Sequence, residues 1–242
     1  MSQEEDRIRS VYQSYEHAEL AQQRWDPSKQ GNRQILTERT RIVRTLLEKA
    51  ALFPLAAKFI LDIGCGSGGE VRQLLEWGAS PCRLYGIDLL PHLIEQARRA
   101  YPLVRFDCAN AEHLPFPDDS IDLVLLFTML SSILDDTMRR RVSSEAARVL
   151  KAGGAVICYD MRYCNPRNPH VRPVGRQDLR MLFPDFQSTM RSLTLLPPLA
   201  RRLGPLTHIG YPLGAAIPFL RSHYAAVLRK PESRRRVACG RI

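Results

Sequence analysis

Apolar and polar residues follow two distinct patterns through the middle of the chain, residues 56–160. Short continuous apolar runs recur there, and the segments between them carry apolar residues at helical spacing. Continuous apolar runs are typical of strands buried in a parallel sheet, whereas helical spacing is typical of amphipathic helices. The predicted strands are residues 59–62, 83–88, 103–107, 122–127 and 155–160, with a helix at 140–150 and a turn at 151–154. Alternating strands and helices favour an α/β domain whose parallel sheet has helices on both faces.

The first 55 residues are predicted to form a helical cap on this core. Tyr12 and Tyr15 belong to an apolar-aromatic cluster at helical spacing, and a second helix is predicted over residues 34–52. Proline and glycine break the segment 24–32 between the two helices, which predicts a loop there.

The strand–helix alternation ends at residue 160, and a mixed region, 161–230, follows. The pattern predicts a short helix at 176–183 and strands at 186–195 and 223–228. Residues 231–242 contain three consecutive arginines and are expected to be a basic, flexible tail.

The segment 193–220 is apolar, but five prolines interrupt it. A helix needs about 20 mostly apolar residues to span a bilayer, so no transmembrane segment is predicted. Three interpretations remain open: a broken-helix lid over an apolar acceptor site, a contact with a membrane surface, and plain packing or a dimer interface.

The segment FILDIGCGSGG at residues 59–69 carries the clearest chemical signal. Its strand ends on Asp62, and the glycines that follow are Gly64, Gly66, Gly68 and Gly69. Glycine lets the backbone turn sharply and approach a ligand closely, and ligands of such sheets bind beyond the strand ends. A phosphate-binding GxxxxGK[ST] loop is excluded, because no lysine follows the last glycine. The GxGxxG dinucleotide spacing is present, but a carboxylate before the first glycine repels pyrophosphate and attracts an amine.

A second acidic residue, Asp88, ends the next predicted strand. A carboxylate at that position can accept both ribose hydroxyls of a nucleoside. The two acids and the glycine turn between them therefore predict a nucleoside site.

Four stretches, LDIGCGSGG, GIDL, AEHLPFPDDSIDLV and EAARVLKAGG, together resemble the class I S-adenosylmethionine-dependent methyltransferases, especially their type-11 small-molecule branch. The resemblance covers residues 58–160 closely and extends more loosely to residue 230. It implies a seven-stranded, mostly parallel, doubly wound (Rossmann-like) sheet with an antiparallel last strand. It also implies S-adenosyl-L-methionine as cofactor, S-adenosyl-L-homocysteine as product, and no metal.

The resemblance also assigns the cofactor-binding residues. They are Asp62, Gly64, Cys65, Gly66 and Gly68 around the methionine moiety, Asp88 at the ribose, Leu89, Asn110 and Ala111 at the adenine, and Phe127 at the methyl-donor end. Family members commonly carry an aspartate where Asn110 stands, and its amide oxygen can still accept a hydrogen bond from adenine.

The acceptor side is less well defined by the resemblance. Many relatives carry histidines where Ser131 and Ser132 stand, so an easily assigned general base is missing. The remaining candidates for a catalytic base are Asp160 and His170, beside the alternative that the nucleophile is oriented without a base. The candidate substrate-lining residues are Tyr15, Trp25, Met129 and Ser131.

The 242-residue chain carries a net charge of +10, unevenly distributed. Residues 1–160 hold 20 Lys and Arg against 22 Asp and Glu, whereas residues 161–242 hold 15 against 3. The basic third suits an anionic acceptor, an acidic membrane face or a solvated surface. Nucleic acid is disfavoured as a partner, because aromatic residues do not interleave with the arginines and the (Asp/Asn)-Pro-Pro-(Tyr/Phe) signature is absent.

Six cysteines without a CxxC pair predict free thiols, with those at 65, 108 and 158 buried, and neither a disulfide framework nor a zinc site. The charged N-terminus, MSQEEDRIRS, lacks an apolar export segment, so a cytoplasmic protein is expected, with peripheral membrane contact as an alternative.

Three functions remain open. The first is methyl transfer to an oxygen or nitrogen of a small metabolite such as a sugar or polyketide. The second is methyl transfer to a lipid-linked or anionic acceptor at a membrane surface. The third is cofactor binding without catalysis, which the presence of both Asp62 and Asp88 disfavours. The sequence predicts no oligomeric state.

Overall fold

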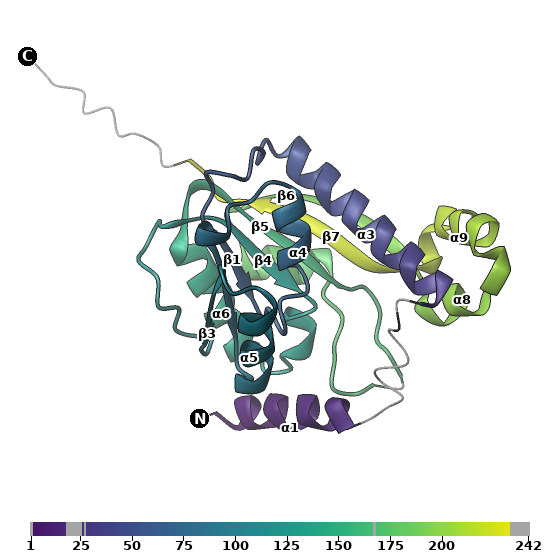
Figure 1. Cartoon of the computed structure of the whole chain (residues 1–242), viewed down its shortest axis with the longest axis horizontal. Coiled ribbons are helices and arrows are strands. Elements are labelled where there is room, and N and C mark those ends of the chain that lie inside the picture. Colours follow the sequence, from purple (N-terminus) through teal and green to yellow (C-terminus); the bar gives the residue numbers. More distant parts are fainter. Residues whose placement is uncertain (1, 18–25, 27, 167, 233–242) are drawn as a thin grey trace, which may run out of the picture.

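A seven-stranded sheet forms the centre of the computed structural model, which describes residues 2–17, 26, 28–166 and 168–232 (Figure 1). Its strands are β1 (Ile60–Ile63), β2 (Leu84–Asp88), β3 (Arg105–Cys108), β4 (Ile121–Phe127), β5 (Leu150–Met161), β6 (Gln187–Leu195) and β7 (Arg221–Arg229). They lie in the order β3-β2-β1-β4-β5-β7-β6, and all neighbours pair in parallel except β7, which is antiparallel to β5 and β6. The predicted fold class is thereby confirmed.

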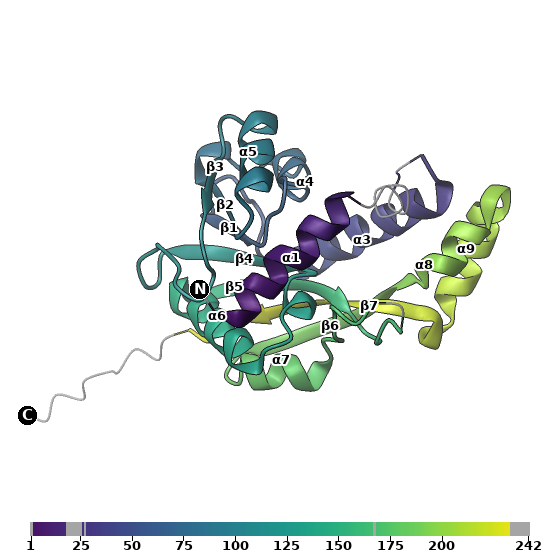
Figure 2. The ribbon, with the colours of Figure 1, turned by 90° about the horizontal axis from the view of Figure 1, so that it is seen from below.

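Helices cover both faces of the sheet (Figure 2). One face packs against α3 (Gln30–Lys49), α4 (Val71–Glu76) and α5 (Pro91–Ala100); α1 (Gln3–His17), α6 (Asp136–Val149) and α7 (Arg176–Leu182) contribute to the core on the other. Strand β4 lies between the two hydrophobic cores, which explains why its sequence is apolar at successive positions. Leu123 and Leu125 pack in one core, and Val124 and Leu126 pack in the other. Helix α6 begins where Asp135 accepts the N–H of Met138 at 2.6 Å, as a helix N-cap.

A lobe is inserted between β6 and β7 at residues 196–220, called the β6–β7 lobe below. It consists of α8 (Pro197–Arg202), a 3-10 turn (Gly204–Leu206), α9 (Thr207–Ala216) and a second 3-10 turn (Pro218–Leu220). The lobe packs on the first half of α3 through a small apolar cluster that includes Ile35, Ala200 and Tyr211. Among the described residues, no helix is both long and apolar enough to cross a membrane.

Three sequence-based predictions require correction. The turn predicted at 151–154 is wrong, because these residues belong to β5; Gly153 has φ +74° there, and the register with β4 shifts between the pairs Ile121–Leu150 and Leu123–Ala155, an irregularity of the β-bulge kind. The second helix begins at Gln30 and not at residue 34, because Gly31 lies inside it against the backbone of α8. Cys108 is exposed, whereas Cys65 and Cys158 are buried as expected.

Candidate functional site

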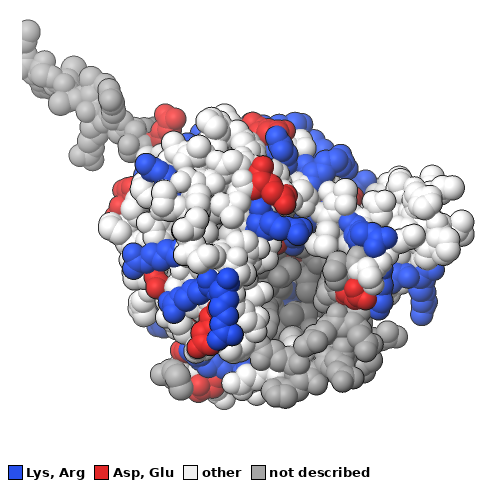
Figure 3. Space-filling model, viewed as in Figure 1, with Lys and Arg blue, Asp and Glu red and all other residues white. Residues whose placement is uncertain are grey.

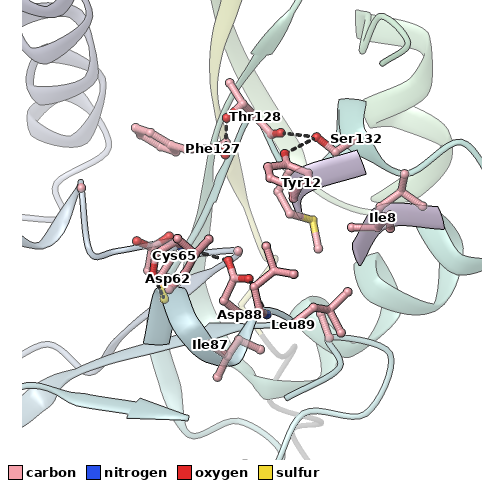
Figure 4. Close-up of a pocket in the computed structure, with 18 of the residues that line it drawn as sticks. Ile8, Tyr12, Asp62, Cys65, Ile87, Asp88, Leu89, Phe127, Thr128 and Ser132 are labelled. Carbon is pink, nitrogen blue, oxygen red and sulfur yellow. Dashed lines mark hydrogen bonds between the residues drawn. The ribbon is translucent and has the colours of Figure 1, made fainter. Parts of the chain in front are cut away.

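A cavity of about 300 Å³ lies beyond the carboxyl ends of β1, β2 and β4 (Figure 4). Such sheet edges are where ligands bind in doubly wound folds. The glycine turn after β1, the ends of β2 and β4, and helix α1 each contribute to its wall. The cavity therefore joins the middle of the chain to the N-terminal cap.

The glycine turn adopts a backbone conformation that side chains disfavour. Gly64, Gly66 and Gly68 have φ values of +75°, +53° and +85°, in the left-handed region. The N–H groups of Gly64 and Cys65 both donate to the carbonyl of Ile87, at 2.8 and 3.0 Å, so the turn is fixed to the end of β2. A Cβ placed at Gly66 would meet no atom within 4 Å, so this part of the backbone faces open space. A ligand can approach it closely.

The Asp62 carboxylate is the most unusual group in the cavity wall. The residue is 4% exposed, and its Oδ2 has no hydrogen-bond partner among the described residues. Burial raises the pKa of Asp62 well above its ordinary value; the nearby carboxylates of Glu70 and Asp88 raise it further, and the Arg39 guanidinium opposes them. An unpaired buried carboxylate is costly, so the position fits a ligand that brings a cationic hydrogen-bond donor.

Asp88 faces the same cavity from the end of β2. Its Oδ2 accepts the N–H of Gly66 at 2.9 Å and its Oδ1 accepts the N–H of Leu90 at 3.0 Å. Burial raises its pKa, and these backbone donors oppose the rise. The carboxylate is thus held in one orientation, and each oxygen keeps a lone pair for a further donor such as a hydroxyl.

Helix α1 closes one side of the cavity with Ile8 and Tyr12. The Tyr12 hydroxyl lies 2.8 Å from Ser132 Oγ, which donates to the Thr128 carbonyl at 3.0 Å (Figure 4). Arg9 donates to the carbonyl of Leu89 at 2.5 Å, which fixes the same helix to the end of β2. The N-terminal segment therefore folds over the cavity.

The three residues assigned to adenine, Leu89, Asn110 and Ala111, line one end of the cavity. The Asn110 side-chain oxygen accepts the N–H of Glu112 at 2.9 Å, and its amide nitrogen lies 3.2 Å from a carboxylate oxygen of Glu112. The amide is therefore oriented by its own loop before any ligand binds.

The opposite end of the cavity is formed by Phe127, Thr128 and Met129, which follow β4. Arg39 reaches this end from α3, where its guanidinium lies 5.6 Å from the centre of the Phe127 ring and 2.7 Å from a carboxylate oxygen of Glu70. Arg39, Glu70 and Tyr12 were not identified as site residues from the sequence. For Glu70, the sequence did give an indication, because the residue directly follows the glycine turn. For Arg39 it gave none, because this arginine is one of several basic residues in α3.

The candidate residues for the acceptor side do not gather in the same way. Asp160 is buried, and its two oxygens accept the N–H groups of Ser131 at 3.0 Å and Met161 at 2.8 Å. Burial raises the pKa of Asp160 to about 6. Neither Asp160 nor Ser131 is among the described residues that line the cavity.

Of the remaining candidates, His170 and Tyr15 are not among the described residues that line the cavity. His170 is exposed in the loop after β5. The Tyr15 hydroxyl donates to Asn168 at 3.0 Å, and its ring packs edge-on against Tyr12 at 5.7 Å. Trp25 lies outside the described residues. The described residues also hold no group of three His, Cys, Asp or Glu side chains that could bind a metal ion.

Residues 61–158 match the family model described as a methyltransferase domain. Among characterised relatives, the chain is 30% identical over 166 residues to a demethylmenaquinone methyltransferase of Tropheryma whipplei, covering 64% of this chain and 65% of the relative. It is 31% identical over 172 residues to the 27-O-demethylrifamycin SV methyltransferase of Amycolatopsis mediterranei, covering 65% of this chain and 61% of the relative. The chain thus spans less than two thirds of either relative.

The fold also occurs in solved structures of low sequence identity. The [4+2]-cyclase SpnF superimposes with a TM-score of 0.58 and 20% identity, covering 80% of this chain and 81% of the cyclase. Because that protein is a cyclase, the likeness establishes the fold and leaves the reaction to be argued from the site.

Proposed function

We infer that this chain, which belongs to the type-11 branch of the class I S-adenosylmethionine-dependent methyltransferases, transfers a methyl group from that cofactor to an oxygen or nitrogen of a small-molecule acceptor. The observation that carries the proposal is the buried Asp62 carboxylate, which lies beside an open glycine turn and whose Oδ2 has no hydrogen-bond partner among the described residues. The protonated α-amino group of a ligand would supply a cationic hydrogen-bond donor to this carboxylate.

The cofactor suits the residues that are present. Asp62 would accept from its ammonium group, and Asp88 would accept from its ribose hydroxyls. Asp62, Glu70 and Asp88 outnumber Arg39 among the charged residues of the cavity wall, so the site favours a ligand with net positive charge. When bound, the cofactor supplies a methyl group on a positively charged sulfur, ready for direct displacement.

The chain's main contribution to such a transfer is position. Phe127, Thr128 and Met129 line the cavity and would form the wall at the methyl-donor end, where alignment of two reactants at short distance supplies a large part of the rate. A base is needed only where the acceptor atom must lose a proton, as a hydroxyl does. We assign Asp160 to positioning, because both its oxygens hold backbone N–H groups, and retain His170 as the candidate base.

A small-molecule acceptor agrees with the names of the two relatives, which act on demethylmenaquinone and a demethylrifamycin. The proposal is tested by offering the protein metabolite pools with S-adenosylmethionine and searching for products heavier by one methylene unit. A methylated metabolite together with S-adenosylhomocysteine is the expected result. Tight cofactor binding without any methylated product would instead favour the non-catalytic alternative.

Replacing Asp88 by alanine should weaken S-adenosylhomocysteine binding by about 1–3 kcal/mol, the cost of losing a charged hydrogen-bond acceptor. Isothermal titration calorimetry measures the change. Asp107→Ala is the matched control, because Asp107 lies near the end of the neighbouring strand β3 and does not line the cavity. Unchanged affinity in Asp88→Ala would refute the assignment of Asp88 to the ribose.

A further inference from the structure

The β6–β7 lobe carries more than half of the large apolar residues that are exposed on the described part of the chain. Four large apolar side chains there are more than half exposed: Leu206 at 66%, Ile209 at 63%, Leu213 at 65% and Phe219 at 69%. Contiguous apolar side chains are rare on soluble monomers unless the surface contacts a partner. The lobe therefore presents an unpartnered contact surface.

Helix α9 is apolar on both of its sides. Its inner side, with Tyr211 and Ala215, packs in the cluster with α3, where the Tyr211 hydroxyl donates to Glu38 at 2.7 Å. Its outer side carries Ile209, Pro212 and Leu213, one helical turn apart and exposed. A helix that is apolar all round is ordinarily covered on every side, and here only the inner side is covered by described residues.

Within the stretch of chain that forms the lobe and its two flanking strands, all of the Lys, Arg, Asp and Glu residues are cationic. No aspartate or glutamate occurs between Asp185 and Glu232. The cations in that stretch are Arg191, Arg201, Arg202, Arg221, Arg229 and Lys230. In Figure 3 the part of the molecule that carries α8 and α9 is white at its outer surface, with blue side chains along its lower edge. An apolar surface bordered by cations matches the interface of an anionic bilayer, which takes up apolar side chains and attracts arginines.

We propose that the β6–β7 lobe docks this protein onto anionic lipid membranes, with Leu206, Ile209, Leu213 and Phe219 entering the interface and Arg202 contacting the lipid headgroups. A second copy of the chain is a poorer occupant, because a two-fold contact would bring the arginine-bordered surfaces of both copies together. The lobe leaves the sheet where Met161 of β5 pairs with His223 of β7, the same edge at which Asp62 and Asp88 lie. Docking through the lobe would thus turn the cofactor-binding edge toward the lipid.

The test is co-sedimentation of the full chain with vesicles, without cofactor, so its outcome is independent of the proposed methyl transfer. Vesicles of mixed phosphatidylglycerol and phosphatidylcholine should carry the protein down at low salt and much less at high salt. Vesicles of phosphatidylcholine alone should bind it weakly. Absence of sedimentation with the anionic vesicles would overturn the proposal.

Variants locate the contact. The double variant Ile209→Asn/Leu213→Asn should lower the partition constant at least about tenfold, since two apolar side chains are lost from the interface. Its matched control is Leu103→Asn/Met181→Asn, which alters two residues outside the lobe that are at least as exposed as Ile209, at 76% and 64%. Arg202→Gln should weaken binding several-fold, and Arg180→Gln, on the exposed side of α7, should not.

Two results would assign the surface differently. Equal binding of the Ile209→Asn/Leu213→Asn variant and its control would show that charges outside the lobe hold the protein on the vesicle. Sedimentation-velocity ultracentrifugation that finds a dimer dissolved by the same variant, without vesicle binding, would assign the surface to self-association. Either result overturns the proposal.

Discussion

Asp62→Asn should bind S-adenosylhomocysteine about 1.5–3 kcal/mol more weakly than the unaltered chain, roughly 10- to 150-fold, because a charged acceptor for the ligand's ammonium group becomes neutral. Asparagine keeps the size and shape of the side chain, so the change isolates the charge. Calorimetric titration measures the loss. Equal affinity in the two proteins would remove Asp62 from the ligand contact.

The same substitution should raise the midpoint of thermal unfolding of the ligand-free protein. The folded chain buries Asp62, leaves its Oδ2 without a hydrogen-bond partner among the described residues, and raises its pKa well above that of an unfolded aspartate. Such a group favours the folded state only when protonated, so its contribution to stability is complete below the unfolded pKa and is lost as the pH rises through the folded pKa. The advantage of the asparagine variant should therefore grow from acid toward neutral pH.

Asp122→Asn provides the control of opposite sign. Asp122 is also a carboxylate in the β4 strand region, but its Oδ2 accepts from Lys151 Nζ and from the N–H of Phe59, both at 2.8 Å. Removing a paired charge should lower the unfolding midpoint, whereas removing the unpaired charge of Asp62 should raise it. A midpoint that falls in both variants would mean that Asp62 has a partner in solution.

Gly31→Ala should destabilise the protein by about 2–4 kcal/mol, although a glycine-to-alanine change inside a helix ordinarily stabilises it. A Cβ at Gly31 would lie 2.3 Å from the carbonyl oxygen of Ala200 and 2.9 Å from the backbone nitrogen of Arg201. Backbone atoms cannot rotate aside as a side chain does, so α8 would have to move away from α3. Urea denaturation followed by circular dichroism measures the loss of free energy of unfolding.

Gly175→Ala is the control for this change, because its Cβ would meet only the Asp178 side chain, at 3.4 Å. Its effect should be small. Amide hydrogen exchange shows which part of the protein is destabilised. In Gly31→Ala the amides of α8 and α9 should exchange faster, and those of β4 should not. A stability equal to that of the unaltered chain would show that α3 and α8 are not in close contact.

The cavity at the carboxyl ends of β1 and β2 could be predicted from the sequence because its geometry is local. In a parallel sheet the carboxyl ends of neighbouring strands share one edge, so acids that end two such strands, Asp62 and Asp88, had to face the same space. The glycine turn is equally local, since its three left-handed residues lie within five positions. The identities of these residues and their order along the chain were sufficient.

The other features of the cavity and the fold depended on contacts between distant parts of the chain, which the sequence does not show. Tyr12 reaches Ser132 across 120 positions, and Arg39 reaches Glu70 from another helix, so no spacing in the sequence marks either pair. The segment 151–154 was predicted to be a turn, but it is part of β5, and its two glycines exchange backbone hydrogen bonds with Lys230, 76 positions farther along the chain. The sequence left three interpretations of the segment 193–220 open, because its packing on α3 joins positions far apart in the chain.

Helix α1 contributes Ile8 and Tyr12 to the cavity wall, and Arg7 and Arg9 fasten it to the carbonyls of Ser132 and Leu89. A nucleoside that passes between this helix and the strand ends requires both of those hydrogen bonds to break first. For that route, the rate of turnover depends on a segment that supplies no reacting atom, in the way that product release limits many enzymes.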